Sequence, residues 1–171
     1  MHPDFSLVEQ LRAQRPLVHC IANIVTVQDC ANIALAAGAR PIMAQHPAEM
    51  AEIASAARAC VLNTGTPNDD KFLACALAGQ AARAAGRPLV LDPVGAPASA
   101  YRRRMLANLL EQIQPTLIRA NPAEIQALLG SADTTAGVDS PDAAPAEQAA
   151  RLGGQLARRY FLYTLNEFSN L

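Results

Sequence analysis

Two stretches of this sequence decide its fold: Leu91-Asp92-Pro93-Val94-Gly95 and Ile118-Arg119-Ala120-Asn121-Pro122-Ala123-Glu124. Each is an apolar strand pattern that ends on polar residues where a helix begins. Held side by side at neighbouring strand ends, the carboxylates of Asp92 and Glu124 would grip a Mg²⁺ ion, either directly or through its waters. Such an ion offsets the charge of nucleotide phosphates. Alone, an Asp-Pro pair usually marks a turn and an Asn-Pro-Ala-Glu run a capped helix start; their order in one chain indicates a site.

The composition is that of one globular domain. The chain has 171 residues, 51% of them hydrophobic, which is enough for a substantial core. Its 14 basic and 15 acidic side chains give a net charge of −1, so it lacks the basic footprint of a nucleic-acid-binding protein. We therefore expect small-molecule ligands and no nucleic-acid partner.

The sequence also favours a cytoplasmic protein without a membrane partner. It has no uninterrupted apolar stretch long enough to cross a bilayer, and its start lacks the regions of a signal peptide. The four cysteines, Cys20, Cys30, Cys60 and Cys75, form no C-x-x-C pair and lie in apolar contexts. Buried free thiols in a reducing compartment are the favoured interpretation, ahead of metal binding.

Strand and helix patterns alternate along the chain. Strands are predicted at residues 17–21, 41–43, 60–63, 88–92 and 116–119, and helices at 5–14, 26–37, 47–57, 69–85, 99–112, 122–129 and 141–160. This alternation predicts an α/β fold, a three-layer structure in which helices cover both faces of a parallel sheet. Residues 131–145 have a loop-like composition.

In such a sheet, ligands bind beyond the carboxyl ends of the strands. Those ends carry Asn23, Met43, residues 63–66, Asp92 and residues 119–121. Each of these residues taken singly is explained by ordinary turn chemistry. The whole set, polar or small at every strand end, favours a ligand site.

Six segments of this chain resemble those of hydroxyethylthiazole kinases, in the same order. They are P-L-V-H-C-I-A-N at 16–23, G-A-R-P-I-M-A at 38–44, V-L-N-T-G-T at 61–66, L-D-P-V-G-A at 91–96, I-R-A-N-P-A-E-I at 118–125 and G-V-D-S at 137–140. The resemblance implies a ribokinase-like fold and ATP- and Mg²⁺-dependent phosphorylation of 4-methyl-5-(2-hydroxyethyl)thiazole in thiamine biosynthesis and salvage. It also implies a homotrimer that binds the thiazole alcohol between neighbouring subunits.

The same resemblance suggests roles for individual residues. It implies thiazole contacts for Met43, Asn23 and Gly65, ATP contacts for Arg119 and Asn121, and a Mg²⁺ site at Asp92 and Glu124. His19 lies between apolar residues of a predicted buried strand, so a packed, hydrogen-bonded histidine is expected there rather than a base.

The sequence departs from the family pattern in several places. Ala22 and Ala120 stand where the family usually has Thr and Gly, and Thr64 stands where it often has Ile. The family continues into V-T-G-E and G-T-G-C motifs that supply an anion hole and a catalytic Cys; neither motif occurs in these 171 residues, so no catalytic residue is assigned.

Residues 158–171 lack Ala and Gly and hold four of the seven aromatic residues. We interpret residues 1–160 as a C-terminally truncated, partial kinase domain and 161–171 as a divergent tail that comes from a frameshifted or truncated reading frame. The alternative is an edge strand at 161–165.

Two functions stay open on the sequence. One is a thiazole kinase that acts by in-line phosphoryl transfer. The other is a non-catalytic remnant that folds and binds a small heterocycle without turnover, and for the isolated chain we expect no measurable kinase activity. A nicotinamide-dependent enzyme is excluded, because no G-x-G-x-x-G follows the first predicted strand.

Overall fold

The structure, a computed structural model, describes residues 6–130, 146–160 and 163–166. Its centre is a six-stranded sheet in the order β2-β1-β3-β4-β5-β6, and every neighbouring pair is parallel. The strands are β1 (Leu17–Ile21), β2 (Arg40–Ile42), β3 (Ala59–Asn63), β4 (Leu89–Asp92), β5 (Leu117–Ala120) and β6 (Tyr163–Asn166). The predicted parallel α/β fold is confirmed.

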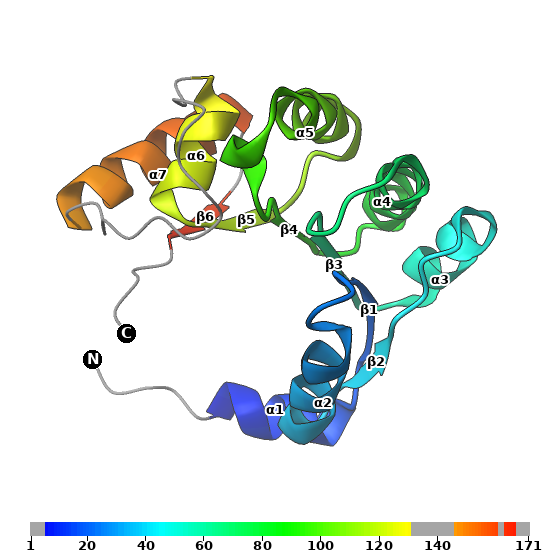
Figure 1. Cartoon of the computed structure of the whole chain (residues 1–171). Helices are drawn as coiled ribbons and strands as arrows, with labels where there is room; N and C mark the ends of the chain where they lie inside the picture. The colour runs from blue at the N-terminus through cyan, green and yellow to red at the C-terminus, as the bar shows by residue number, and fades with distance from the viewer. Residues whose placement is uncertain (1–5, 131–145, 161–162, 167–171) are drawn as a thin grey trace.

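Helices lie on both faces of this sheet (Figure 1). On one face α3 (Met50–Ala56), α4 (Asp69–Ala84) and α5 (Ala100–Ile113) pack in a row, followed by α6 (Pro122–Leu129) and α7 (Ala146–Tyr160). On the other face, α1 (Ser6–Gln14) and α2 (Val27–Ala37) lie beside β1 and β2. Two short 3₁₀ helices, η1 (Pro47–Glu49) and η2 (Ala96–Ala98), precede α3 and α5.

The core lies between the sheet and the α3–α5 row. Cys60 pairs in register with Leu89, and Leu62 with Leu91, and all four side chains are buried against these helices. Strand side chains alternate between faces, so the residues between them point to the opposite side of the sheet. At the carboxyl ends of β3 and β4, these oppositely directed residues are Asn63 and Asp92.

Most predicted elements form within one residue of the expected bounds, and three of the differences change the description of the fold. The predicted strand at 41–43 begins and ends one residue earlier, which leaves Met43 just beyond β2. The predicted helix at 47–57 is divided into η1 and α3. Tyr163–Asn166 form a strand that pairs with β5, in agreement with the edge-strand alternative. The predicted loop at 131–145 and residues 141–145 of the last predicted helix lie outside the described residues.

The expectation of four buried cysteines is wrong for one of them. Cys60 and Cys75 are buried and Cys20 is half-buried, but Cys30 on α2 is exposed. Helix α2 has no buried residue at all, and its Ile33 and Leu35 are largely exposed. A helical repeat of apolar residues shows which side is apolar, but not whether another element covers it.

None of the helices in the described part of the chain is both long and apolar enough to span a bilayer.

We predict that Gly79→Ala destabilises the fold, because α4 and α5 approach closely at this position. An added Cβ would lie 2.5 Å from Cγ2 and 2.7 Å from Cβ of Ile113. Overpacking of this kind costs about 1–3 kcal/mol, and the better helix propensity of Ala returns only about 1 kcal/mol. Urea unfolding of both proteins measures the difference.

Gly154→Ala in α7 is the matched control for this prediction. Its added Cβ would meet nothing closer than the Arg158 guanidinium at 3.6 Å, so the helix-propensity gain is unopposed. Equal stability effects in the two variants would contradict the packing explanation.

Candidate functional site

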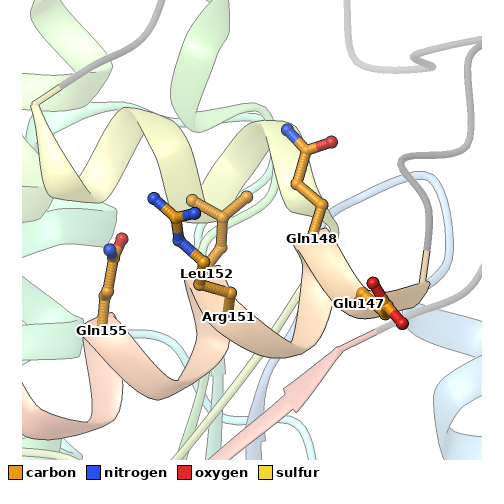
Figure 2. A pocket seen from close by; sticks show the side chains of 5 residues that line it. All are labelled: Glu147, Gln148, Arg151, Leu152 and Gln155. Carbon is orange, nitrogen blue, oxygen red and sulfur yellow. The ribbon is translucent and has the colours of Figure 1, made fainter.

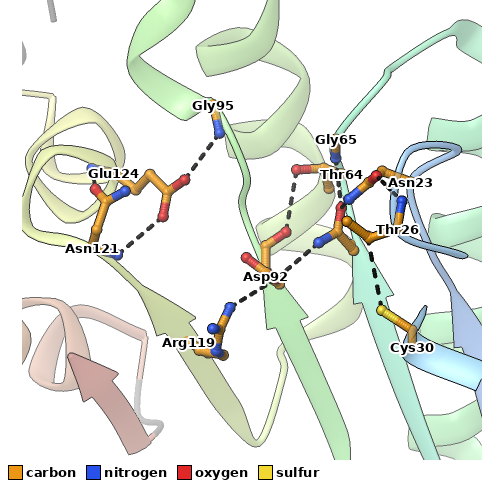
Figure 3. Close-up of polar contacts among 11 residues, drawn as sticks. Asn23, Thr26, Cys30, Thr64, Gly65, Asp92, Gly95, Arg119, Asn121 and Glu124 are labelled. Carbon is orange, nitrogen blue, oxygen red and sulfur yellow. Dashed lines mark hydrogen bonds and ion pairs between the residues drawn. The ribbon is translucent and has the colours of Figure 1, made fainter. Parts of the chain in front are cut away.

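The carboxyl ends of β3, β4 and β5 bring three polar side chains together (Figure 3). Asn63 and Asp92 are register partners on β3 and β4. The Asn63 amide donates to Oδ2 of Asp92 at 2.8 Å, and the Arg119 guanidinium forms an ion pair with the same oxygen at 3.2 Å. The sequence analysis predicted a site at this edge of the sheet, and Asp92 and Arg119 meet there.

The Asp92 carboxylate is in a partly desolvated position. Its side chain is 14% exposed, whereas that of Arg119 is 46% exposed. Burial raises the pKa of Asp92 above its usual value, although the charge of Arg119 and the hydrogen bonds from Asn63 and Arg119 oppose the rise. Its negative charge therefore costs stability, as is common for groups kept for binding or chemistry.

Glu124 joins two loops beyond the strand ends. One carboxylate oxygen accepts from the Gly95 N–H and the other from the Asn121 N–H, each at 3.0 Å. The Asn121 side chain in turn accepts from the Glu124 N–H at 2.9 Å, which completes a capping box at the start of α6. Asn121 and Glu124 thus form the capped helix start that the motif commonly marks.

Asp92 and Glu124 lie close enough to influence each other. Burial raises the pKa of Glu124, and the negative charge of Asp92 raises it further. The described residues contain no group of three or more His, Cys, Asp or Glu side chains that could enclose a metal ion. Within the described part of the chain, a cation at this edge would therefore meet the carboxylates of Asp92 and Glu124, with water or ligand oxygens completing its coordination.

Asn23 and Gly65 meet beside this cluster, at the ends of β1 and β3. The Asn23 amide donates to Oδ1 of Asn63 at 3.3 Å, and the Gly65 N–H donates to the same oxygen at 2.9 Å. A Cβ on Gly65 would lie 2.9 Å from Cβ of Asn23, so only glycine fits here without a shift.

A cavity of about 450 Å³ opens next to Asn23 and Gly65. It is lined by Ile24, Val27, Gln45, Thr66, Asn68, Asp70 and Lys71. The Ile24 N–H donates to the Thr66 hydroxyl at 3.2 Å, which joins the loops after β1 and β3 at this cavity.

Lys71 is a residue of this region that sequence reasoning missed. It is 7% exposed, and its ammonium donates to the carbonyls of Ala22 at 2.8 Å and Gly65 at 2.6 Å. Burial lowers the pKa of Lys71. Lysine is seldom buried without such partners, so Lys71 is a clamp between the loops that carry Asn23 and Gly65. Its one available signal was that it is the only lysine in an arginine-rich chain.

His19 supports the loop that follows Met43. His19 is fully buried; its Nε2 donates to the Ala44 carbonyl at 3.0 Å, and its Nδ1 lies 4.0 Å from Sγ of Cys60. The prediction of a packed, hydrogen-bonded histidine is confirmed. Met43 itself is half-buried, just before Ala44.

Comparison with known proteins decides the family. The model of the hydroxyethylthiazole kinase family matches residues 8–164. The chain belongs to the hydroxyethylthiazole kinase family. A hydroxyethylthiazole kinase of Nitratidesulfovibrio vulgaris strain Hildenborough is 48% identical over 153 residues, which cover 90% of this chain and 57% of the relative. One of Alkaliphilus metalliredigens is 46% identical over 136 residues, which cover 80% of this chain and 50% of the relative.

The fold agrees with this family. A solved structure of a hydroxyethylthiazole kinase protein from Pyrococcus horikoshii OT3 superposes with a TM-score of 0.82 at 32% identity, covering 95% of this chain and 59% of that protein. The chain spans about half the length of the curated relatives it matches.

A second hollow, of about 480 Å³, lies along α7 (Figure 2). It is lined by Glu147, Gln148, Arg151, Leu152 and Gln155. None of the residues that the family pattern indicates lies there, so we assign it no role in the candidate site.

We predict that His19 makes folding stability fall in mild acid. Burial lowers the pKa of His19 below its ordinary value of 6.5. Below about pH 6.5 the unfolded chain therefore binds more protons than the folded one, so this contribution is complete above pH 6.5 and is lost as the pH falls toward the folded pKa. The loss is at most about 1.4 kcal/mol per pH unit.

Urea unfolding between pH 7.5 and 5.5 measures this slope, with His19→Gln as the comparison. Glutamine keeps an N–H donor for Ala44 but does not titrate, so the variant should show a flatter slope. The raised pKa values of Asp92 and Glu124 act in the opposite direction, but they do so in both proteins. Identical slopes would exclude His19 as the source.

Proposed function

We propose that this chain carries the carboxylate and heterocycle-contacting part of a hydroxyethylthiazole kinase site. The reaction is the ATP-dependent phosphorylation of the hydroxyl of 4-methyl-5-(2-hydroxyethyl)thiazole. The observation that supports it best is the joining of Asp92 to Arg119 on one side and, through Asn63, to Asn23 and Gly65 on the other. In this proposal, Asp92 and Arg119 bind the metal ion and the phosphates, and they lie next to the Asn23 and Gly65 side of a pocket for a small ring.

Mg²⁺ suits the donors at this edge, which are carboxylate oxygens. Asp92 would hold the ion, and Glu124 would act through water because both of its oxygens already accept backbone N–H bonds. When bound, the ion offsets the negative charge of the phosphates during transfer. In this structure the Asp92 carboxylate forms an ion pair with the cationic side chain of Arg119. This ion pair supports the proposal that the carboxylate binds a cation.

Arg119 and Asn121 would contact the nucleotide. The guanidinium of Arg119 is half-exposed, and its planar donors suit phosphate oxygens. The side-chain oxygen of Asn121 is used in the α6 cap, so its amide N–H₂ is the group left for a phosphate.

Met43, Asn23 and Gly65 would form the thiazole pocket. A thioether is an apolar, polarizable partner for a sulfur-containing ring, and glycine permits close approach of the backbone. Asn23 uses its oxygen to hold the Val25 and Thr26 N–H groups, so its main effect is on the shape of the pocket wall.

We further propose a cytoplasmic homotrimer. Ile24 and Val25 are 77% and 78% exposed, and Ile33 and Leu35 on α2 are also exposed; such an apolar surface favours burial between subunits. The free state of all four cysteines is typical of a reducing compartment. The division into a partial kinase domain, residues 1–160, and a divergent tail, 161–171, stays a prediction.

We predict that Asp92→Asn weakens Mg²⁺-ATP binding at least about tenfold, because it removes the charge nearest the proposed ion. The variant should unfold at the same or a higher temperature, since it also removes a partly buried charge. Isothermal titration calorimetry and thermal unfolding measure the two effects. Glu52→Gln, the same charge change at an exposed position on α3, should leave nucleotide affinity unchanged.

Mass spectrometry of the thiazole alcohol incubated with Mg²⁺-ATP then separates the two functions. Phosphorylated product from the wild-type chain, absent with Asp92→Asn, establishes turnover. Binding of both ligands without product identifies the alternative, a protein that binds the heterocycle without turnover. Failure of the wild-type chain to bind either ligand contradicts the proposal.

We predict that the thiazole alcohol raises the melting temperature of the oligomer but not that of the monomer. A ligand stabilises a protein only where its complete site exists. Ile24 and Val25, which directly follow the proposed pocket residue Asn23, are exposed apolar residues that a neighbouring subunit would cover. Sedimentation would identify the oligomer, and Ile33→Glu on exposed α2 would produce the monomer. Equal stabilisation of the monomer would place the whole pocket within one chain.

A further inference from the structure

Asn63 occupies the junction between the two halves of the proposed site. It is the last residue of β3 and lies directly opposite Asp92 on β4. Its side chain bonds to groups on both sides, with Oδ1 toward Gly65 and Asn23 and Nδ2 toward Asp92. The family resemblance indicated roles for Asn23, Gly65 and Asp92 but none for Asn63.

The orientation of the Asn63 amide is determined by its partners. The carboxylate of Asp92 only accepts hydrogen bonds and the N–H of Gly65 only donates, so Nδ2 must face Asp92 and Oδ1 must face Gly65. An inverted amide would set oxygen against oxygen on one side and N–H against N–H on the other.

Asn23 is oriented by the same rule. Its oxygen accepts from the N–H groups of Val25 and Thr26, at 3.0 and 3.1 Å, so its amide N–H₂ faces Asn63. One directed path of hydrogen bonds therefore runs from Asn23 through Asn63 to Asp92, where Arg119 also donates. The path crosses the sheet at the ends of β1, β3, β4 and β5.

We propose that Asn63 is a positioning residue that couples the shape of the thiazole pocket to the placement of the Asp92 carboxylate. This inference rests on the proposed function, because that function supplies the two ligands. A ligand that orders Asn23 and Gly65 also orders the Asn63 amide, and thereby the oxygen of Asp92 that it holds. Binding of Mg²⁺-nucleotide at Asp92 orders the same path from the other end.

Coupling of this kind is reciprocal. If the thiazole alcohol raises the affinity for Mg²⁺-nucleotide by some factor, the nucleotide must raise the affinity for the alcohol by the same factor. We expect a factor of at least about five in the wild-type chain, within the range usual for coupled sites.

The test measures this factor by calorimetry with the thiazole alcohol and the Mg²⁺ complex of a non-hydrolysable ATP analogue, each alone and in the presence of the other. Asn63→Leu removes every side-chain hydrogen bond at a similar volume, and should bring the factor close to one. Asn23→Asp breaks the path one bond earlier but keeps the acceptor for Val25 and Thr26, and should lower the factor as well. This second variant keeps the test informative if Asn63→Leu folds poorly.

Ser99→Ala is the control for lost stability alone. Its hydroxyl caps α5 by accepting from the Arg102 N–H at 3.1 Å, outside the Asn63 path. It should keep the wild-type factor. A wild-type factor retained in Asn63→Leu and Asn23→Asp would overturn the proposal, as would a wild-type factor of one.

A ligand-free measurement keeps this inference distinct from the proposed function. In the full chain without ligands, Asp92→Ala should accelerate hydrogen exchange at the Gly65 amide about threefold to tenfold, because Asn63 then loses the partner that orients it. Leu62, whose amide lies within β3, should exchange at an unchanged rate. Failure of the wild-type chain to bind either ligand would contradict the proposed function alone, whereas an unchanged rate at Gly65 would overturn the coupling role of Asn63.

Discussion

The parallel pairing of β3 with β4 is the constraint on which the rest of this structure depends. Its register sets Leu62 against Leu91 in the core and, one residue later, Asn63 against Asp92 on the other face. Because side chains alternate between faces, a slip of one residue would expose the leucines and bury the polar pair. The same register that closes the core therefore assembles the site.

The site is stabilised by the remainder of the fold rather than by its own residues. Burial raises the pKa values of Asp92 and Glu124 and lowers that of Lys71, so each charge is held at a cost. Each is surrounded by directed partners: Asn63 and Arg119 at Asp92, backbone N–H groups at Glu124, and carbonyls at Lys71. The apolar core between the sheet and α3–α5 offsets that cost, as expected where function departs from optimal stability.

Two buried side chains form hydrogen bonds with the backbone of the loops around the proposed heterocycle pocket. Lys71 rises from α4 to the carbonyls of Ala22 and Gly65, and His19 reaches from β1 to the carbonyl of Ala44 beyond β2. Neither titratable group needs to act as an acid or a base to matter. Their hydrogen bonds restrict the conformations of these loops before a ligand binds. Binding then costs less conformational entropy.

The sequence by itself determined the parallel α/β class, the residues at the strand ends and the packed state of His19. It also contained the six segments typical of the family. These features could be predicted because hydrophobic periodicity and turn preferences depend on residues that are neighbours in the chain. Only the tertiary structure decided that Asn63 lies opposite Asp92, that Lys71 clamps two loops and that both oxygens of Glu124 accept backbone N–H groups. It also decided that Cys30, Ile33 and Leu35 on α2 are exposed. These features depend on strand register and on which elements cover which faces. Both are set by contacts between residues far apart in the chain, which no local pattern records.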